Sequence, residues 1–131
     1  MEEVFKIKKL FKSLMEAPVH EFPSSGPVRV TNENGVYIII GLKDEVLHVG
    51  KTSRAKNGLD QRLQNHIEGN SSFTIIHLSG KGKKLRNGFK FKFIVVSDDR
   101  QRALLEAMGV ALLCPVHLGT GGASMSKLSE K

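Results

Sequence analysis

A tyrosine and a histidine occupy two short apolar segments whose spacing could place a hydroxyl beside an imidazole. Tyr37, the only tyrosine, stands within 35–40, and His48 follows eleven residues later within 46–49. Both segments are typical of strands, and the turn-forming residues from Gly41 predict an antiparallel hairpin. Paired in this way, the two side chains can share one face and transfer a proton, because histidine titrates near neutral pH. The alternative is a core tyrosine with a satisfied hydroxyl beside an ordinary strand histidine.

A lone acid stands in an apolar stretch near the C-terminal end. Glu106 is the only ionisable side chain between residues 103 and 113, which are otherwise Ala, Leu, Met, Val and Gly. An acid in such surroundings is costly unless it is paired or bound to a cation. Because Mg²⁺ takes one or two carboxylates together with waters and phosphate, Glu106 suffices for a single Mg²⁺ or Mn²⁺ ion. The alternative is a structural ion pair with Arg62.

Three cationic or titratable side chains lie between these two features. Arg62 is predicted on a helix over 58–68, and its guanidinium could hold two phosphate oxygens at once. Lys51 directly follows the segment His48-Val49-Gly50 and could contact the same phosphate. His66, one helical turn after Arg62, is interpreted as a partly buried residue that supports the site. Solvated basic side chains remain the alternative for Arg62 and Lys51.

The chain is basic overall, with a net charge of +7 and a pI near 9.7, which favours an anionic partner such as nucleic acid. Further cations with no acid among them predict a flexible basic hairpin around Gly80, Gly82 and Gly88 that follows a phosphate backbone. An edge strand guarded by solvated lysines is the alternative. The predicted nucleic-acid-binding residues are Arg54, Lys56, Lys81, Lys83, Lys84, Arg86 and Lys90.

The hydrophobic pattern predicts how these residues are positioned. Helices are expected over 3–15, 58–68 and 100–113, and strands over 35–40, 46–49, 73–78 and 89–96. This order predicts an α/β fold with a small, mainly antiparallel sheet of about three to five strands flanked by helices. We expect residues 1–34 to form an N-terminal helix and extended connection, residues 35–118 the core, and residues 119–131 a flexible tail.

The ordered motifs resemble one known family. Gly35-Val36-Tyr37, then His48-Val49-Gly50, then Arg62-Leu63-Gln64-Asn65-His66 and finally Glu106 are similar to the signature of the GIY-YIG nucleases. His48 replaces the second tyrosine of that signature. The asparagine often found after the last helix is missing, since Val116, His117 and Leu118 stand there.

The resemblance implies a metal-dependent endonuclease, with DNA favoured as the substrate. It implies that Tyr37, His48, Arg62, Lys51 and Glu106 are catalytic, with Glu106 holding the metal ion. The departures at His48 and at the missing asparagine keep a second hypothesis open, which is a nucleic-acid-binding module on the same fold with weak or absent turnover. A homodimer or a larger complex is also left open.

Three further sequence features concern the cellular compartment and two other kinds of binding site. A single cysteine and the absence of a signal peptide or a membrane-spanning run predict a cytoplasmic protein. Gly50-Lys51-Thr52 is similar to the end of a P-loop, but Glu45 stands where that motif needs glycine. Cys114 and His117 could form half of a zinc site with His66 or His77, although no second matched pair exists.

Overall fold

The computed structural model describes residues 2–53 and 57–118. The elements in chain order are α1 (Glu2–Glu16), β1 (His20–Glu21), β2 (Gly35–Ile40), β3 (Val46–Lys51), α2 (Gly58–Ile67), α3 (Ser72–His77), the 3₁₀ helix η1 (Gly82–Arg86), β4 (Lys90–Val95) and α4 (Asp99–Leu113). The predicted hairpin, helices and final strand are confirmed to within two residues at each end. Among the described helices, none is long and apolar enough to cross a membrane.

The four strands form one antiparallel sheet in the order β1-β4-β2-β3. β2 lies between two partners and all its residues are buried, which explains why its sequence is continuously apolar rather than alternating. Tyr37 pairs with Gly50 and Ile39 pairs with His48 across the hairpin. Because alternate residues share a face, Tyr37 and His48 project on the same side of the sheet, as predicted.

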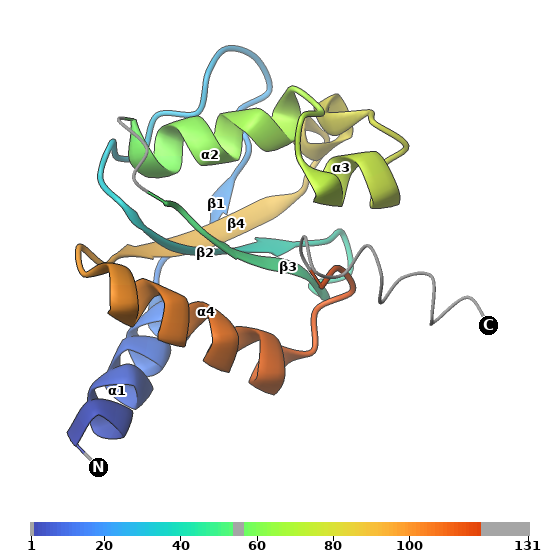
Figure 1. The fold of residues 1–131 in the computed structure, drawn as a ribbon. Helices are drawn as coiled ribbons and strands as arrows, with labels where there is room; N and C mark the ends of the chain where they lie inside the picture. The colour runs from blue at the N-terminus through green and yellow to red at the C-terminus, as the bar shows by residue number, and fades with distance from the viewer. Residues whose placement is uncertain (1, 54–56, 119–131) are drawn as a thin grey trace.

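Helices cover both faces of this sheet, with α2 and α3 on one side and α1 and α4 on the other (Figure 1). On the first side, Tyr37 and Ile39 join a core that includes Leu63 of α2. On the opposite side, Val36 and Ile38 join a second core that includes Leu14, Leu105 and Val49. Each fully buried leucine of this kind stabilises the fold by about 1.5–3 kcal/mol. The confirmed α/β architecture is therefore a three-layer one.

The strand predicted over 73–78 is wrong, because α3 occupies that segment. The β-branched run through Ile75 and Ile76 favours a strand, but Ser71 caps a helix by accepting a hydrogen bond from the Thr74 N–H. Phe73 and Thr74 are both buried, while Ile75 and Ile76 are both exposed. Burial in consecutive pairs fits one face of a helical turn and not the alternation of a strand.

The basic hairpin predicted around residues 80–88 is also wrong, because the described chain forms η1 there. Gly82 packs so closely against the carbonyl oxygens of His66 and Ile67 that a Cβ at this position would overlap them. Leu85 is fully buried and joins the α2-side core. Close backbone packing and this apolar anchor seat η1 against the C-terminal end of α2.

Candidate active site

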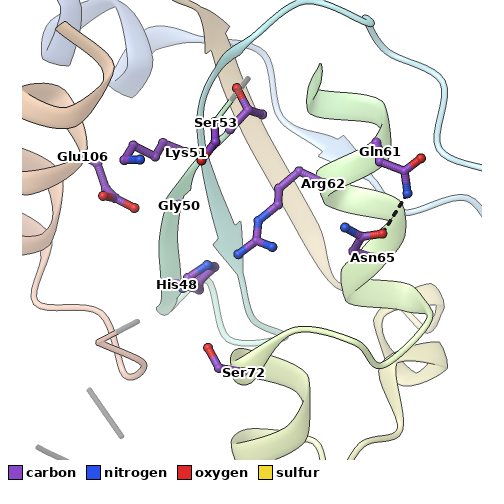
Figure 2. A pocket seen from close by; sticks show the side chains of 10 residues that line it. His48, Gly50, Lys51, Ser53, Gln61, Arg62, Asn65, Ser72 and Glu106 are labelled. Carbon is purple, nitrogen blue, oxygen red and sulfur yellow. Dashed lines mark hydrogen bonds between the residues drawn. The ribbon is translucent and has the colours of Figure 1, made fainter. Parts of the chain in front are cut away.

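A pocket of about 440 Å³ opens where β3 meets α2 and α4 (Figure 2). Four of the predicted catalytic residues line it, although they lie far apart in the sequence. The lining residues are His48, Gly50, Lys51, Thr52, Ser53, Gln61, Arg62, Asn65, Ser72 and Glu106. The fifth predicted residue, Tyr37, is fully buried behind this lining.

The pocket receives side chains from both faces of the sheet, because β3 is an edge strand. Tyr37 and His48 belong to the face covered by α2, whereas Lys51, which pairs with Val36, belongs to the face covered by α4. Gly50 lies between them in the strand. A Cβ at Gly50 would overlap the Tyr37 phenol oxygen and lie 2.9 Å from His48 Nε2, so this glycine makes room for the buried pair.

The Tyr37 phenol is the centre of a buried hydrogen-bond network. Arg62 Nε–H donates to Tyr37 Oη at 3.2 Å, and His48 Nε2 lies 3.4 Å from the same oxygen. The remainder of the Arg62 guanidinium points from α2 into the pocket (Figure 2). Tyr37 therefore orients the arginine from behind, while Arg62 presents its outer nitrogens to whatever occupies the pocket.

Glu106 enters from the α4 side, with Lys51 next to it (Figure 2). Its surroundings raise the pKa of the Glu106 carboxyl, because partial burial outweighs the opposing attraction of Lys51 and Arg62. Within residues 2–53 and 57–118, no cation lies within 4.0 Å of this carboxylate. The structural ion pair between Glu106 and Arg62 is therefore not formed.

Residues 33–108 match the family model described as the GIY-YIG catalytic domain. This span is more than half of the chain, and it contains Tyr37, His48, Arg62 and Glu106. The chain belongs to the GIY-YIG family. It is a GIY-YIG-type endonuclease, and nucleic acid is its substrate class. Among curated proteins, none matches this chain.

Solved GIY-YIG structures are similar to this chain over most of its length. A point mutant of the N-terminal endonuclease domain of UvrC from Thermotoga maritima, bound to its catalytic divalent cation, is 21% identical with a TM-score of 0.49. That likeness covers 88% of this chain and 97% of the other. The magnesium-bound form of the same domain is 21% identical with a TM-score of 0.45, and covers 85% and 93%.

The GIY-YIG motif residues are held in an uncharged form. Burial raises the pKa of Tyr37 to about 12, with Arg62 opposing this effect, so the phenol keeps its proton at neutral pH. Burial, followed by repulsion from His117, lowers the pKa of His48 to about 3. Within the described part of the chain, Nδ1 of His48 has no hydrogen-bond partner. His48 therefore lines the pocket as a neutral imidazole, and its unsatisfied Nδ1 is buried.

His66 has a more central place in this GIY-YIG site than the sequence interpretation assigned. It is fully buried rather than partly buried, and its Nε2 lies 2.6 Å from Tyr37 Oη. Its Nδ1 lies 2.6 Å from the Ser71 hydroxyl. The Arg-Leu-x-x-His run could have indicated this role, because His66 follows Arg62 by one helical turn and therefore lies on the same side of α2.

The predicted nucleic-acid-binding residues are divided among several places. Lys81, Lys83 and Lys84 are exposed at η1, and they line a second cavity of about 420 Å³ away from the catalytic residues. Arg86 instead donates to the carbonyl oxygens of Pro23 and Gly26, both at 2.8 Å. Lys90 lies 3.6 Å from an Asp44 carboxylate oxygen. Arg54 and Lys56 fall outside the described residues.

The zinc site considered from the sequence is not formed in the described part of the chain. No group of three or more His, Cys, Asp or Glu side chains is placed there to hold a metal ion. The Cys114 thiol is exposed and donates to Ala111 O at 3.6 Å. His117 is buried and contacts Ser72 and His77 instead.

The buried histidines make the stability of this endonuclease dependent on pH. Burial lowers the pKa of His117 to about 4 and that of His48 to about 3, whereas an unfolded chain protonates histidine near pH 6.5. Below pH 6.5 the unfolded state therefore binds more protons, so the free energy of unfolding should fall with acidification. We expect a loss approaching roughly 1.4 kcal/mol per pH unit for each neutral histidine between about pH 6.5 and 4.

Urea unfolding at pH 7.0, 6.0 and 5.0 measures this dependence. The variant His117→Gln should give a shallower dependence than the wild type, because it removes one of the groups that the fold keeps neutral. His20→Gln, on β1 and outside this cluster, is the matched control and should retain the wild-type slope. Equal unfolding free energies at the three pH values would contradict the prediction.

Proposed function

We propose that this chain is a divalent-metal-dependent endonuclease that hydrolyses phosphodiester bonds of DNA. The observation that supports it best is the convergence of Glu106, Lys51, Arg62 and His48 on one pocket. These residues supply a carboxylate, two fixed cations and a neutral imidazole. Hydrolysis of a phosphodiester needs an activated water and neutralisation of the charge that develops on phosphate, and these groups match both needs.

The donor set fits one Mg²⁺ or Mn²⁺ ion at Glu106. Its carboxylate lines the pocket without a cation close enough to form an ion pair among the described residues. Among the residues that the structure describes, no second carboxylate lines the pocket, so the remaining ligands would come from water and from the substrate phosphate. Such an ion, when bound, would polarise the phosphate and stabilise charge on the leaving oxygen.

The other catalytic roles are assigned to different side chains of the pocket. Arg62 holds the non-bridging phosphate oxygens, and Tyr37 keeps its guanidinium in place. Lys51 adds a second positive charge beside Glu106. His48 accepts the proton of the attacking water, because arrival of the anionic phosphate raises the pKa of this imidazole above its value in the free pocket.

Duplex DNA fits the surface better than an unstacked single strand. The described Phe and Tyr side chains are buried or half-buried except for Phe5 on α1, so among the described residues no exposed Phe or Tyr borders the pocket as a stacking platform. The cations Lys81, Lys83 and Lys84 favour contact with a phosphate backbone rather than with bases.

A cleavage screen tests the proposal. Wild-type protein should nick or cut at least one of linear, nicked, flapped and four-way DNA in the presence of Mg²⁺ or Mn²⁺. Chelation with EDTA should abolish cutting and Mg²⁺ in excess should restore it, because the proposed reaction needs the ion that Glu106, the one carboxylate among the described pocket residues, would hold. Duplex RNA of the same sequence is the control for substrate class.

Three results would each contradict part of the proposal. Cutting that is unaffected by EDTA would exclude the metal role of Glu106. Tight DNA binding without any cutting under all these conditions would instead favour the binding module with lost turnover. Preferential cutting of the RNA duplex would change the substrate while leaving the chemistry unchanged.

A further inference from the structure

Ser72 brings a hydroxyl to the pocket that the catalytic assignment does not use. It lies in the first turn of α3, lines the pocket and points its oxygen toward the side where His48 lies (Figure 2). Its Oγ lies 3.1 Å from Nε2 of His117. His117 stands in the stretch where the family's asparagine is missing.

His117 is fixed in place by its surroundings. It is only 2% exposed, and its backbone N–H donates to Leu47 O of β3 at 2.8 Å. Its ring packs with its centre 5.1 Å from that of His48. On the other side of the ring, Nδ1 lies 3.1 Å from Nε2 of the exposed His77. A continuous chain of contacts therefore joins the pocket to solvent through Ser72, His117 and His77.

The direction of these hydrogen bonds follows from what the pocket would bind. The pKa of His117 lies near 4, so its ring is neutral at pH 7, accepting at one nitrogen and donating at the other. If His77 donates to His117 and His117 donates to Ser72, the hydroxyl proton of Ser72 is left for the pocket. With an anionic phosphate in the pocket, each hydrogen bond of this chain then has its donor directed toward the negative charge. Hydrogen bonds aligned in this way polarise one another.

We propose that Ser72 donates a hydrogen bond to a non-bridging oxygen of the substrate phosphate, and that His117, supported by His77, orients its hydroxyl. The proposal rests on the proposed phosphodiester hydrolysis at this pocket. Ser72 is then a substrate-binding residue, and the two histidines are positioning residues that act through it.

The first test replaces Ser72 and measures kcat and KM on a DNA substrate that the wild type cuts with Mg²⁺. Ser72→Ala should lower kcat/KM roughly tenfold to a hundredfold, because a hydrogen bond to a charged group is lost. Ser72→Thr, which keeps the hydroxyl, should retain most of the activity. Ser13→Ala, an exposed position on α1, is the matched control and should behave as the wild type.

A double-mutant cycle separates positioning from general support of the fold. His117→Asn is too short to reach Ser72, so it should lower kcat/KM in the wild type but add little in the Ser72→Ala background. A purely structural role for His117 would reduce activity by the same factor in both backgrounds. His77→Ala changes an exposed residue, leaves the core intact and should lower kcat/KM by roughly threefold through the same chain.

The outcomes are distinct. Wild-type cleavage with undiminished activity of Ser72→Ala would overturn this inference and leave the proposed function standing. Equal losses from His117→Asn in both backgrounds would overturn the positioning role. Absence of wild-type cleavage on every substrate would remove the proposed function and this inference with it.

Discussion

Replacing Glu106 with glutamine should lower kcat by about a thousandfold or more and remove the response to Mg²⁺. Glutamine keeps the size of the side chain but not the charge that would hold a cation. Metal ions contribute several kcal/mol of charge stabilisation in such reactions, and about 1.4 kcal/mol corresponds to a factor of ten. The measurement is a single-turnover rate on labelled DNA across a range of Mg²⁺ concentrations.

The same substitution should not destabilise the fold. Partial burial raises the pKa of the Glu106 carboxyl, so the ionised form is disfavoured in the folded state, and a neutral glutamine relieves that cost. Glu21→Gln, exposed on β1, is the matched control and should change neither rate nor stability. A wild-type rate for Glu106→Gln at saturating Mg²⁺ would contradict the assigned role.

Arg62→Lys should lower kcat by about a hundredfold to a thousandfold, the range observed for loss of one donor to a developing oxyanion. Lysine keeps the positive charge but has no planar fork that can hold two phosphate oxygens while bonding Tyr37 from behind. Because charge is conserved, binding of DNA should weaken far less than the rate falls. Rates at saturating substrate and fluorescence anisotropy of labelled DNA measure the two effects separately.

Arg29→Lys provides the control for this substitution, since Arg29 is exposed and lies outside the pocket. It should leave both rate and affinity unchanged. If Arg62→Lys weakens DNA binding but leaves the rate at saturating substrate unchanged, Arg62 serves substrate binding alone. That result would remove the argument that Tyr37 orients the guanidinium for the transition state.

The parts of this site that sequence could predict are those set by local pattern. The hairpin follows from two short β-branched segments around a turn, and its register places Tyr37 and His48 on one face. α4 follows from its apolar run and from Asp98, whose side chain caps it by accepting from the Gln101 N–H at 2.8 Å. Glu106 is conspicuous because its neighbours in sequence are apolar.

The remainder depends on contacts between segments distant in sequence. The sequence favours a strand over 73–78 because local propensity takes no account of contacts between distant residues. One such contact is the hydrogen bond between His66 of α2 and Ser71, which holds the side chain that caps α3. The position of His117 is similarly unpredictable from local pattern, since its two ring hydrogen bonds are made with α3 and its backbone hydrogen bond with β3. The burial of the Tyr37 side chain also depends on how closely α2 packs over the sheet.

The position of the pocket on the edge strand determines how this fold can be enlarged. A new strand added beside His48 to Lys51 of β3 would lie across the opening between α2 and α4. The short β1 edge, at the opposite end of the sheet, carries no catalytic residue. An added module or fusion partner that extends the sheet therefore leaves the pocket open to substrate only when it is joined at the β1 edge.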